Sequence, residues 1–213
     1  MRTVRAPGVK VCGVTRVEDA ALAVELGADF VGLNFWPRSP RYLTPEAARP
    51  IVEAVRGRTR VVGVWVDPDR QEVQSVDDAL RLDLLQFHGD RVPGSVSWFP
   101  ERVIKALRVG ADFSEDDLCQ FDQAWGFLFD HAPAGVFGGT GESWSYERIA
   151  DLETPKPVLL AGGLNAENVV AAITASGADI VDVCSGVEIS PGIKDRALLV
   201  RFMDEVGNVK DRD

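Results

Sequence analysis

The chain has 213 residues, 46% of them hydrophobic, with a formal net charge of −10 at pH 7 and a pI near 4.7. A chain of this length and apolar content can bury a full core, so we expect one domain over residues 1–213. The acidic charge argues against a sequence-independent nucleic-acid binder, which needs a basic face.

Short, β-branched and nearly continuously apolar runs recur along the chain, as is typical of strands buried on both faces of a parallel sheet. In chain order these runs are Val9–Val14, Phe30–Phe35, Val61–Val66, Leu84–Phe87, Val103–Leu107, Phe127–Asp130, Val158–Ala161 and Ile180–Cys184. Amphipathic segments between them predict helices over Glu18–Leu26, Pro45–Val55, Glu72–Leu80, Tyr146–Leu152, Ala166–Ala175 and Asp195–Val206.

Two connections carry weaker helical patterns. Asp90–Phe99 contains Pro93 and Gly94, which shorten any helix there, and Ser114–Phe121 spans only about two turns. The alternation of strands and helices still favours an α/β, single-domain (β/α)8 TIM barrel. A doubly wound open sheet is the alternative, because a strand count does not establish closure.

In such a barrel, reactive groups gather where strands end and loops begin. Cys12 stands at a strand end before Gly13, and Lys10, two residues earlier, should point to the same side and favour the thiolate. The alternative for Cys12 is inert packing. Asp130 follows the apolar run from Phe127, where a carboxylate must be paired, solvated or functional; partial desolvation would raise its pKa and suit a general acid.

Two glycine-containing strand exits predict a phosphate site. Gly162 and Gly163 leave the seventh strand run, and Ser185 and Gly186 leave the eighth. Backbone N–H groups at the seventh and eighth loops of a barrel bind phosphate well, and the alternative is that these glycines only form tight turns. Gly139-Thr140-Gly141 is a candidate third arm.

Three further side chains have both a functional and a structural interpretation. Asp182 either holds a substrate hydroxyl or pairs with a lysine inside the barrel. Arg41 either binds a carboxylate or is a solvated surface group. His88 either lines the site or is a structural histidine.

The odd count of cysteines predicts neither a disulfide framework nor a zinc site, and Cys119 and Cys184 are interpreted as structural. With only two histidines, we expect no histidine-based metal site. The first residues lack the apolar stretch of a signal peptide and no run is long enough to span a membrane, so we expect a cytoplasmic protein without a membrane partner.

Taken together, these segments resemble the phosphoribosylanthranilate isomerase family of tryptophan biosynthesis, over residues 8 to 206. The matching stretches are Val9–Thr15, Ser39–Tyr42, Val62–Val66, Gln86–Gly89, Asp130 with Gly138–Gly141, Leu160–Asn165, Asp182–Glu188 and Pro191–Asp195. The sequence departs from the family pattern at Phe87, His131, Cys184 and Trp144-Ser145-Tyr146.

The resemblance implies a (β/α)8 barrel that converts N-(5-phosphoribosyl)anthranilate to 1-(2-carboxyphenylamino)-1-deoxyribulose 5-phosphate by an Amadori rearrangement. It implies that Asp130 is the general acid and Cys12 the general base, and that the reaction needs no metal and no redox cofactor. Arg41 would face the anthranilate carboxylate, and Asp182 would contact the sugar. The phosphate would rest on backbone amides around Gly162, Gly163, Ser185 and Gly186.

Two other functions are weaker alternatives. The aminoimidazole carboxamide ribotide isomerase family should show two similar half-barrels and an aspartate base, and the sequence has no half-repeat. A barrel that only binds a phosphorylated metabolite gives no reason for the pair of Cys12 and Asp130. No long exposed apolar helix indicates an interface, so a monomer is expected.

Overall fold

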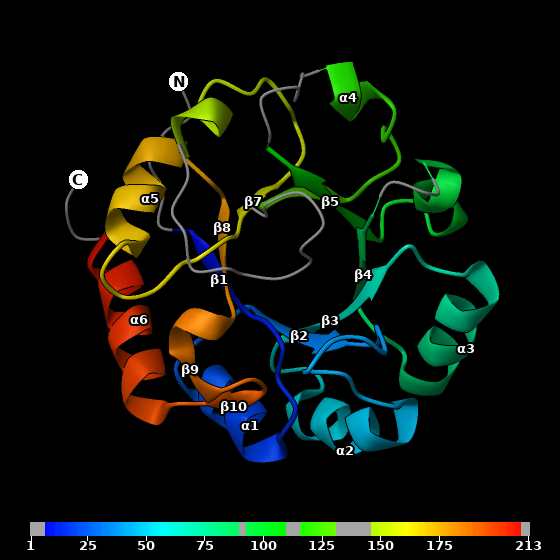
Figure 1. Cartoon of the computed structure of the whole chain (residues 1–213), viewed down its shortest axis with the longest axis horizontal. Coiled ribbons are helices and arrows are strands. Elements are labelled where there is room, and N and C mark those ends of the chain that lie inside the picture. The colour runs from blue at the N-terminus through cyan, green and yellow to red at the C-terminus, as the bar shows by residue number, and fades with distance from the viewer. Residues whose placement is uncertain (1–6, 90–92, 110–115, 131–145, 210–213) are drawn as a thin grey trace.

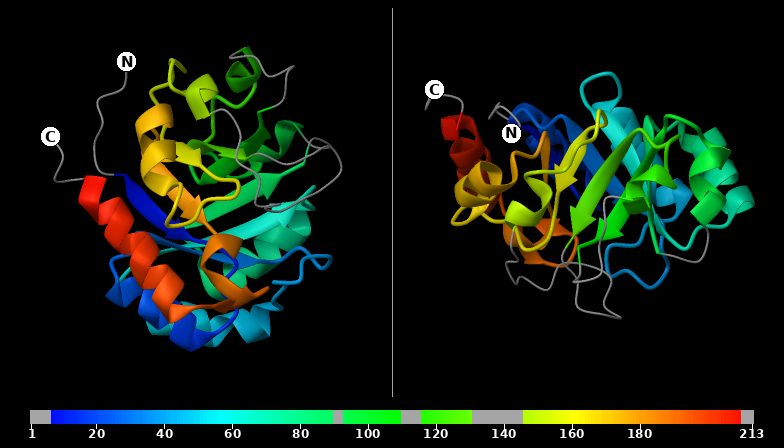
Figure 2. Two further views of the ribbon diagram at one scale, coloured as in Figure 1. Left: turned by 60° about the vertical axis from the view of Figure 1, so that its left-hand side comes forward. Right: turned by 90° about the horizontal axis from the view of Figure 1, so that it is seen from above.

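The structure is a computed structural model and describes residues 7–89, 93–109, 116–130 and 146–209. Eight parallel strands form a closed barrel in which each strand pairs with the next and β8 pairs with β1. Helices surround the strands in every view (Figures 1 and 2). The predicted (β/α)8 barrel is therefore confirmed, and the pairing of β1 with β8 excludes an open sheet.

The strands follow the predicted apolar runs closely. They are β1 (Gly8–Val11), β2 (Phe30–Asn34), β3 (Arg60–Val66), β4 (Leu84–His88), β5 (Val103–Arg108), β6 (Gly126–Asp130), β7 (Val158–Leu160) and β8 (Ile180–Val183). The first and last were predicted to run on to Val14 and Cys184, and these residues instead belong to the loops that follow the strands.

The α-helices are α1 (Val17–Glu25), α2 (Pro45–Val55), α3 (Arg70–Leu80), α4 (Asp116–Cys119), α5 (Val169–Ser176) and α6 (Arg196–Val209). Short 3-10 helices are η1 (Pro93–Trp98), η2 (Tyr146–Ile149) and η3 (Ser185–Val187). Thr44 caps α2 as its position before Pro45 suggests, since its hydroxyl accepts a hydrogen bond from the Ala47 N–H at 3.3 Å. None of the helices in the described ranges has the length and apolar character to cross a bilayer.

The prediction of an α-helix over Tyr146–Leu152 was wrong. The segment forms the 3-10 helix η2, and Leu152 then donates an i→i−3 hydrogen bond to Ile149. Its buried apolar residues, Tyr146, Ile149 and Leu152, recur every third position. That spacing matches the three-residue turn of a 3-10 helix.

Apolar side chains form two separate cores because successive strand residues point to opposite faces. The larger core lies between the strands and the helices and includes Val11, Phe87 and Phe129. The smaller core fills the barrel interior and consists of Phe30, Val62, Leu84, Ile104, Ala106, Leu128, Leu159, Ala161 and Ile180.

The same hydrogen bond between an aspartate carboxylate and a backbone N–H links neighbouring strands at three places near their amino ends. Asp29 accepts a hydrogen bond from the Val9 N–H at 2.8 Å, and Asp179 accepts one from Val158 at 2.8 Å. Asp83 accepts a hydrogen bond from the Val61 N–H at 2.7 Å. Each aspartate directly precedes its own strand, so it links that strand to a neighbour.

A small antiparallel hairpin, β9 (Glu188–Ser190) and β10 (Ile193–Lys194), follows η3 and lies beside α1 (Figures 1 and 2). The Lys194 N–H donates to Asp19 of α1 at 3.1 Å. The Thr15 hydroxyl donates to the Gly192 carbonyl at 2.6 Å. These bonds fix the hairpin against the loop that leaves β1, next to the carboxyl ends of the strands.

Candidate active site

One cavity lies at the carboxyl ends of the barrel strands, where the loops begin. Its lining includes most of the residues expected from the sequence to act on a substrate: Cys12, Arg41, His88, Asp130, Gly162, Gly163, Asp182 and Ser185. The barrel thus brings together side chains that are more than a hundred residues apart in sequence. This is the end at which barrel enzymes hold their reactive groups.

Cys12 is half-buried at the end of β1, and its sulfur lies over Gly32 of β2. A side chain at Gly32 would bring a Cβ to 2.8 Å from the Cys12 sulfur, so the glycine makes room for the thiol. The neighbouring Cys184 thiol and the positive charges of Lys10 and Lys194 lower the pKa of Cys12, against the effect of burial. The site therefore favours the thiolate form.

Lys10 is fully buried and binds Asp182, with its ammonium 2.9 Å from each carboxylate oxygen. The two residues are register partners on β1 and β8. Burial opposes the Lys10 charge, but Asp182 and Cys12 outweigh it and raise its pKa. Of the two interpretations of Asp182, the lysine pair is present, and its carboxylate also borders the cavity.

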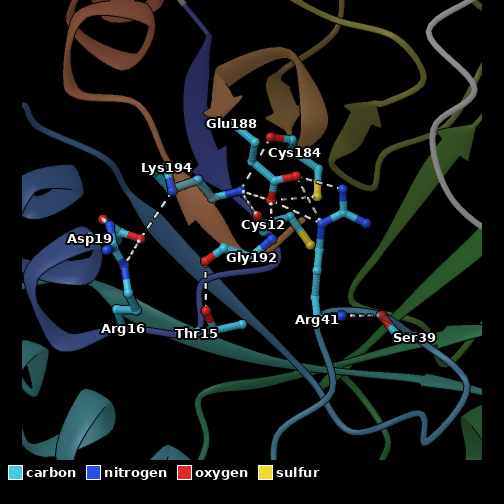
Figure 3. Close-up of polar contacts among 10 residues, drawn as sticks. All are labelled: Cys12, Thr15, Arg16, Asp19, Ser39, Arg41, Cys184, Glu188, Gly192 and Lys194. Atoms are coloured by element: carbon cyan, nitrogen blue, oxygen red, sulfur yellow. Dashed lines mark hydrogen bonds and ion pairs between the residues drawn. The ribbon is translucent and has the colours of Figure 1, made fainter. Parts of the chain in front are cut away.

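Arg41 is held by a carboxylate, Glu188, in a network that Figure 3 shows. Its Nε donates to Glu188 at 2.9 Å and its Nη2 at 2.6 Å, and its side chain is only 16% exposed. The interpretation of Arg41 as a solvated surface group was therefore wrong. The hydrogen bonds to Glu188 raise the pKa of Arg41, which keeps the guanidinium charged.

Lys194 completes this network from β10. Its buried ammonium donates to Glu188 at 2.9 Å, to the Cys184 carbonyl at 3.2 Å and to the Cys12 carbonyl (Figure 3). Despite burial, the bonds from Arg41 and the charge of Lys194 lower the pKa of Glu188. The carboxylate is thus ionised between two cations, and Lys194 joins the ends of β1 and β8.

Asp130 ends β6 and is half-buried at the cavity wall. It is the register partner of Arg108 at the end of β5. Its position at the cavity agrees with what the sequence suggests. The acid role itself remains a proposal.

His88 lines the cavity from β4, and its Nε2 lies 2.7 Å from the Gln86 side-chain nitrogen. Burial and the charges of Lys10, Lys105 and Arg108 lower the pKa of His88 to about 3. The imidazole is therefore neutral at physiological pH. A neutral ring can offer one N–H donor and one acceptor to its surroundings.

The two glycine-containing exits differ in their relation to the cavity. Gly162 and Gly163 line it and have φ of +94° and +66°, which favour glycine. Ser185 also lines it, whereas Gly186 packs against the Leu164 carbonyl, 2.0 Å from where a Cβ would lie. Asn165 and Asn168 cap each other ahead of α5, with the Asn165 N–H donating to Asn168 at 2.8 Å. The first exit therefore enters a helix, as the phosphate hypothesis requires.

The sequence analysis assigned no role to Glu188 or Lys194. Cys184 was interpreted as structural, but it lines the cavity, and its sulfur lies 3.9 Å from Glu188 Oε1. Cys119 was also interpreted as structural, and it is exposed. For Cys184 a signal was available in the sequence: a closed barrel pairs the first strand with the last, so the residues after β1 and β8 lie side by side.

Several expectations fall outside the described residues. These concern the third arm at Gly138–Gly141, the neighbour His131, and Trp144 and Ser145. Within the described part of the chain, no group of three or more His, Cys, Asp or Glu side chains is arranged to hold a metal ion.

Comparison with known proteins gives one consistent result. Residues 9–205 match the family model described as N-(5'phosphoribosyl)anthranilate (PRA) isomerase. The chain is 45% identical over 198 residues to the N-(5'-phosphoribosyl)anthranilate isomerase of Pseudomonas savastanoi, covering 92% of this chain and 96% of that protein.

Solved structures agree with the sequence comparison. The phosphoribosyl anthranilate isomerase of Thermus thermophilus superposes with a TM-score of 0.83 at 33% identity, covering 95% of this chain and 99% of that one. A phosphoribosyl anthranilate isomerase in complex with reduced 1-(o-carboxyphenylamino)-1-deoxyribulose 5-phosphate superposes with a TM-score of 0.78 at 31% identity, with the same coverage.

Proposed function

The chain belongs to the N-(5'-phosphoribosyl)anthranilate isomerase family, and we propose that Asp130 and Cys12 are its general acid and general base. The protein is an isomerase of tryptophan biosynthesis, and its reaction is an Amadori rearrangement of an aminoaldose to an aminoketose. The single observation that carries the assignment of roles is that these two groups border one cavity, Cys12 from directly after β1 and Asp130 from the end of β6.

The first step opens the sugar ring. Asp130 gives its proton to the furanose ring oxygen, the bond from that oxygen to C1′ breaks, and the amine nitrogen supplies the electron pair of the resulting Schiff base. Asp130 is left as a carboxylate. A half-buried carboxyl group at the cavity wall suits this transfer, because proton donors act best when water is partly excluded.

The second step moves a proton within the substrate. The Cys12 thiolate removes the proton from C2′, and the electrons of that bond neutralise the Schiff base to give an enolamine, which tautomerises to the ketone. The low pKa of Cys12 makes the thiolate available without a separate activating base. No further cofactor enters this scheme.

Binding of the substrate is assigned to the remaining cavity residues. Arg41 pairs with the anthranilate carboxylate while Glu188 holds the opposite edge of its guanidinium, and Asp182 contacts the sugar. His88, being neutral, lines the same pocket as a hydrogen-bonding group. The phosphate rests on the loops at Gly162, Gly163, Ser185 and Gly186.

The test follows the fluorescence of phosphoribosylanthranilate generated in situ. We expect rapid loss of fluorescence with the unmodified protein and a kcat lower by about 10³ for Asp130→Asn. Asp122→Asn, the same change at an exposed position, is the matched control and should retain full turnover. Binding of the reduced product analogue by Asp130→Asn should stay within about threefold, which separates the acid role from misfolding.

Two outcomes would count against this assignment. Near-normal kcat in Asp130→Asn would remove Asp130 from the acid role. No turnover by a well-folded unmodified protein would favour a barrel that only binds a phosphorylated ligand.

A monomer in a reducing compartment, the cytoplasm, is part of the same proposal. The thiols of Cys12, Cys119 and Cys184 are all free, as is usual where disulfides do not form. Light scattering on the purified chain should give a mass of 23.2 kDa, and twice that mass would indicate a dimer instead.

A further inference from the structure

Cys184 lies beside Cys12 because of the register between β1 and β8. Lys10 pairs with Asp182 and Val11 with Val183, so the next residue of each strand end is a cysteine. The Cys12 N–H donates to the Val183 carbonyl at 2.8 Å, which continues the pairing to this position. Adjacent strands lie about 4.8 Å apart, and the two side chains therefore meet in the cavity.

Two acceptors are within reach of the Cys184 thiol. One is Glu188, whose Oε1 lies 3.9 Å from the Cys184 sulfur (Figure 3). That oxygen already accepts from Arg41 at 2.9 Å, from Lys194 at 2.9 Å and from the Gly192 N–H at 3.2 Å. A carboxylate oxygen with three shorter bonds is a poor acceptor for a weak S–H donor, which leaves the Cys12 sulfur.

Lys194 fixes the two strand ends to each other. Its buried ammonium donates to the carbonyls of both Cys12 and Cys184. Gly13 leaves room for the Cys184 sulfur, since a Cβ at this position would lie 2.9 Å from that sulfur.

We propose that Cys184 is a positioning residue for the proton transfer: its S–H donates a hydrogen bond to the Cys12 sulfur and holds it as a thiolate facing the substrate. The proposal rests on the proposed function, in which Cys12 is the base. It goes beyond that function because it assigns a role to Cys184, a position at which the sequence departs from the family pattern.

Other charged groups also act on Cys12, so the effect of Cys184 must be measured against them. Lys10 faces it from β1, Lys194 from β10 and Arg41 from the loop after β2, and all three are cations. Asp182 of β8 also faces Cys12, and burial raises the pKa of Asp182 to about 7. All four groups stay in place when only residue 184 changes.

The experiment measures alkylation of Cys12 by iodoacetamide as a function of pH, by mass spectrometry of the Cys12 and Cys184 peptides. Cys119→Ser serves as the background because the Cys119 thiol is exposed and would react on its own. Cys184→Ala and Cys184→Ser are compared in this background, with a thiol reductant removed just before labelling. Serine keeps a donor at position 184 and alanine does not.

We expect the Cys12 peptide to be labelled before the Cys184 peptide in the background protein. At about pH 6.5, Cys184→Ala should lower the Cys12 alkylation rate about tenfold, the effect of one lost hydrogen bond to a charged group. Cys184→Ser should restore it to within about threefold. The pH profile of kcat/KM should shift to higher pH in Cys184→Ala and return in Cys184→Ser.

The alkylation measurement tests the hydrogen bond from Cys184, and the turnover measurement tests the role of Cys12 as the base, so the two claims can be refuted separately. Equal alkylation rates in the alanine and background proteins, or earlier labelling of Cys184, would overturn the proposal. A shifted alkylation profile with an unchanged turnover profile would support the hydrogen bond and refute Cys12 as the base. Alanine and serine variants that unfold at the same urea concentration exclude a packing effect as the cause of any difference.

Discussion

At the scale of single residues, three cations are buried or nearly buried around the cavity although the protein is acidic. Lys10 and Lys194 are buried, and Arg41 is nearly so, whereas the net charge of the chain is −10. Each cation is balanced by a carboxylate, Asp182 or Glu188, which makes its burial tolerable. Of the three cations only Arg41 lines the cavity, together with the carboxylates Asp130 and Asp182, so an anionic substrate would meet this one guanidinium rather than a generally positive surface.

The neutral state of His88 gives a stability effect with a defined sign. The pKa of His88 falls from 6.5 to about 3 on folding, so below about pH 6.5 the unfolded chain binds a proton that the folded protein does not. The free energy of unfolding should therefore decrease as pH falls through this range, by up to about 1.4 kcal/mol per pH unit. Above about pH 6.5 the contribution is fully present.

Urea unfolding at several pH values tests this, with His88→Gln as the comparison. The unmodified protein should lose stability more steeply than His88→Gln between about pH 6 and pH 4. Parallel curves would mean that His88 is protonated in the folded protein.

Much of the candidate site could be predicted from single residues, because strand ends are recognisable in sequence. Cys12 and Asp130 stand at strand ends, Asp182 interrupts the last apolar run, and all three line the cavity. The partners of these residues could not be predicted. Arg41 and Glu188 are 147 positions apart in the sequence, and the hydrophobic pattern of neighbouring residues carries no information about such a distant contact.

At the scale of elements, the hairpin of β9 and β10 brings two charged side chains to the closed barrel. Its two strands have three and two residues, too short for any periodicity to mark them. It nevertheless supplies Glu188 and Lys194, the two groups that connect Arg41 to the end of β1. The site is therefore partly built from an element that sequence patterning cannot detect.

Glu188→Gln should destabilise the protein and weaken substrate binding together. The change leaves Arg41 and the buried Lys194 without their counter-charge, which typically costs about 3–5 kcal/mol in the free energy of unfolding. We also expect a higher KM, since Arg41 loses the contact that fixes its orientation.

The matched control is Glu167→Gln, which removes an exposed pair with Arg201 at 3.9 Å. An exposed pair contributes little, so stability should change by less than about 0.5 kcal/mol. If urea unfolding gave similar losses for both variants, the Glu188 network would have no special role in stability.

At the scale of the whole molecule, one end of the barrel forms the candidate site and the other end contributes to stability. The carboxyl ends of the strands hold the cavity, and the amino ends hold the aspartates that join neighbouring strands. The apolar runs predicted eight strands and favoured a barrel, but only the pairing of β1 with β8 in the structure establishes that the sheet is closed.

Asp29→Ala should separate stability from turnover. It removes the acceptor of the Val9 N–H and should lower the free energy of unfolding by about 1–2 kcal/mol, with kcat unchanged. Asp29→Asn keeps an oxygen acceptor and should recover most of the loss. Thermal unfolding and the fluorescence assay on the same samples measure both quantities, and a large fall in kcat would contradict this division of tasks.

The bonds from Lys194 to the carbonyl of Cys12 also bear on biosynthesis on the ribosome. They span 182 positions, and β1 reaches its second neighbour only when β8 has been made. Contacts this distant in sequence form late and slow the search for the native state. The reactive thiol is thus synthesised together with β1, yet it gains the surroundings that activate it only after the ribosome has added Lys194.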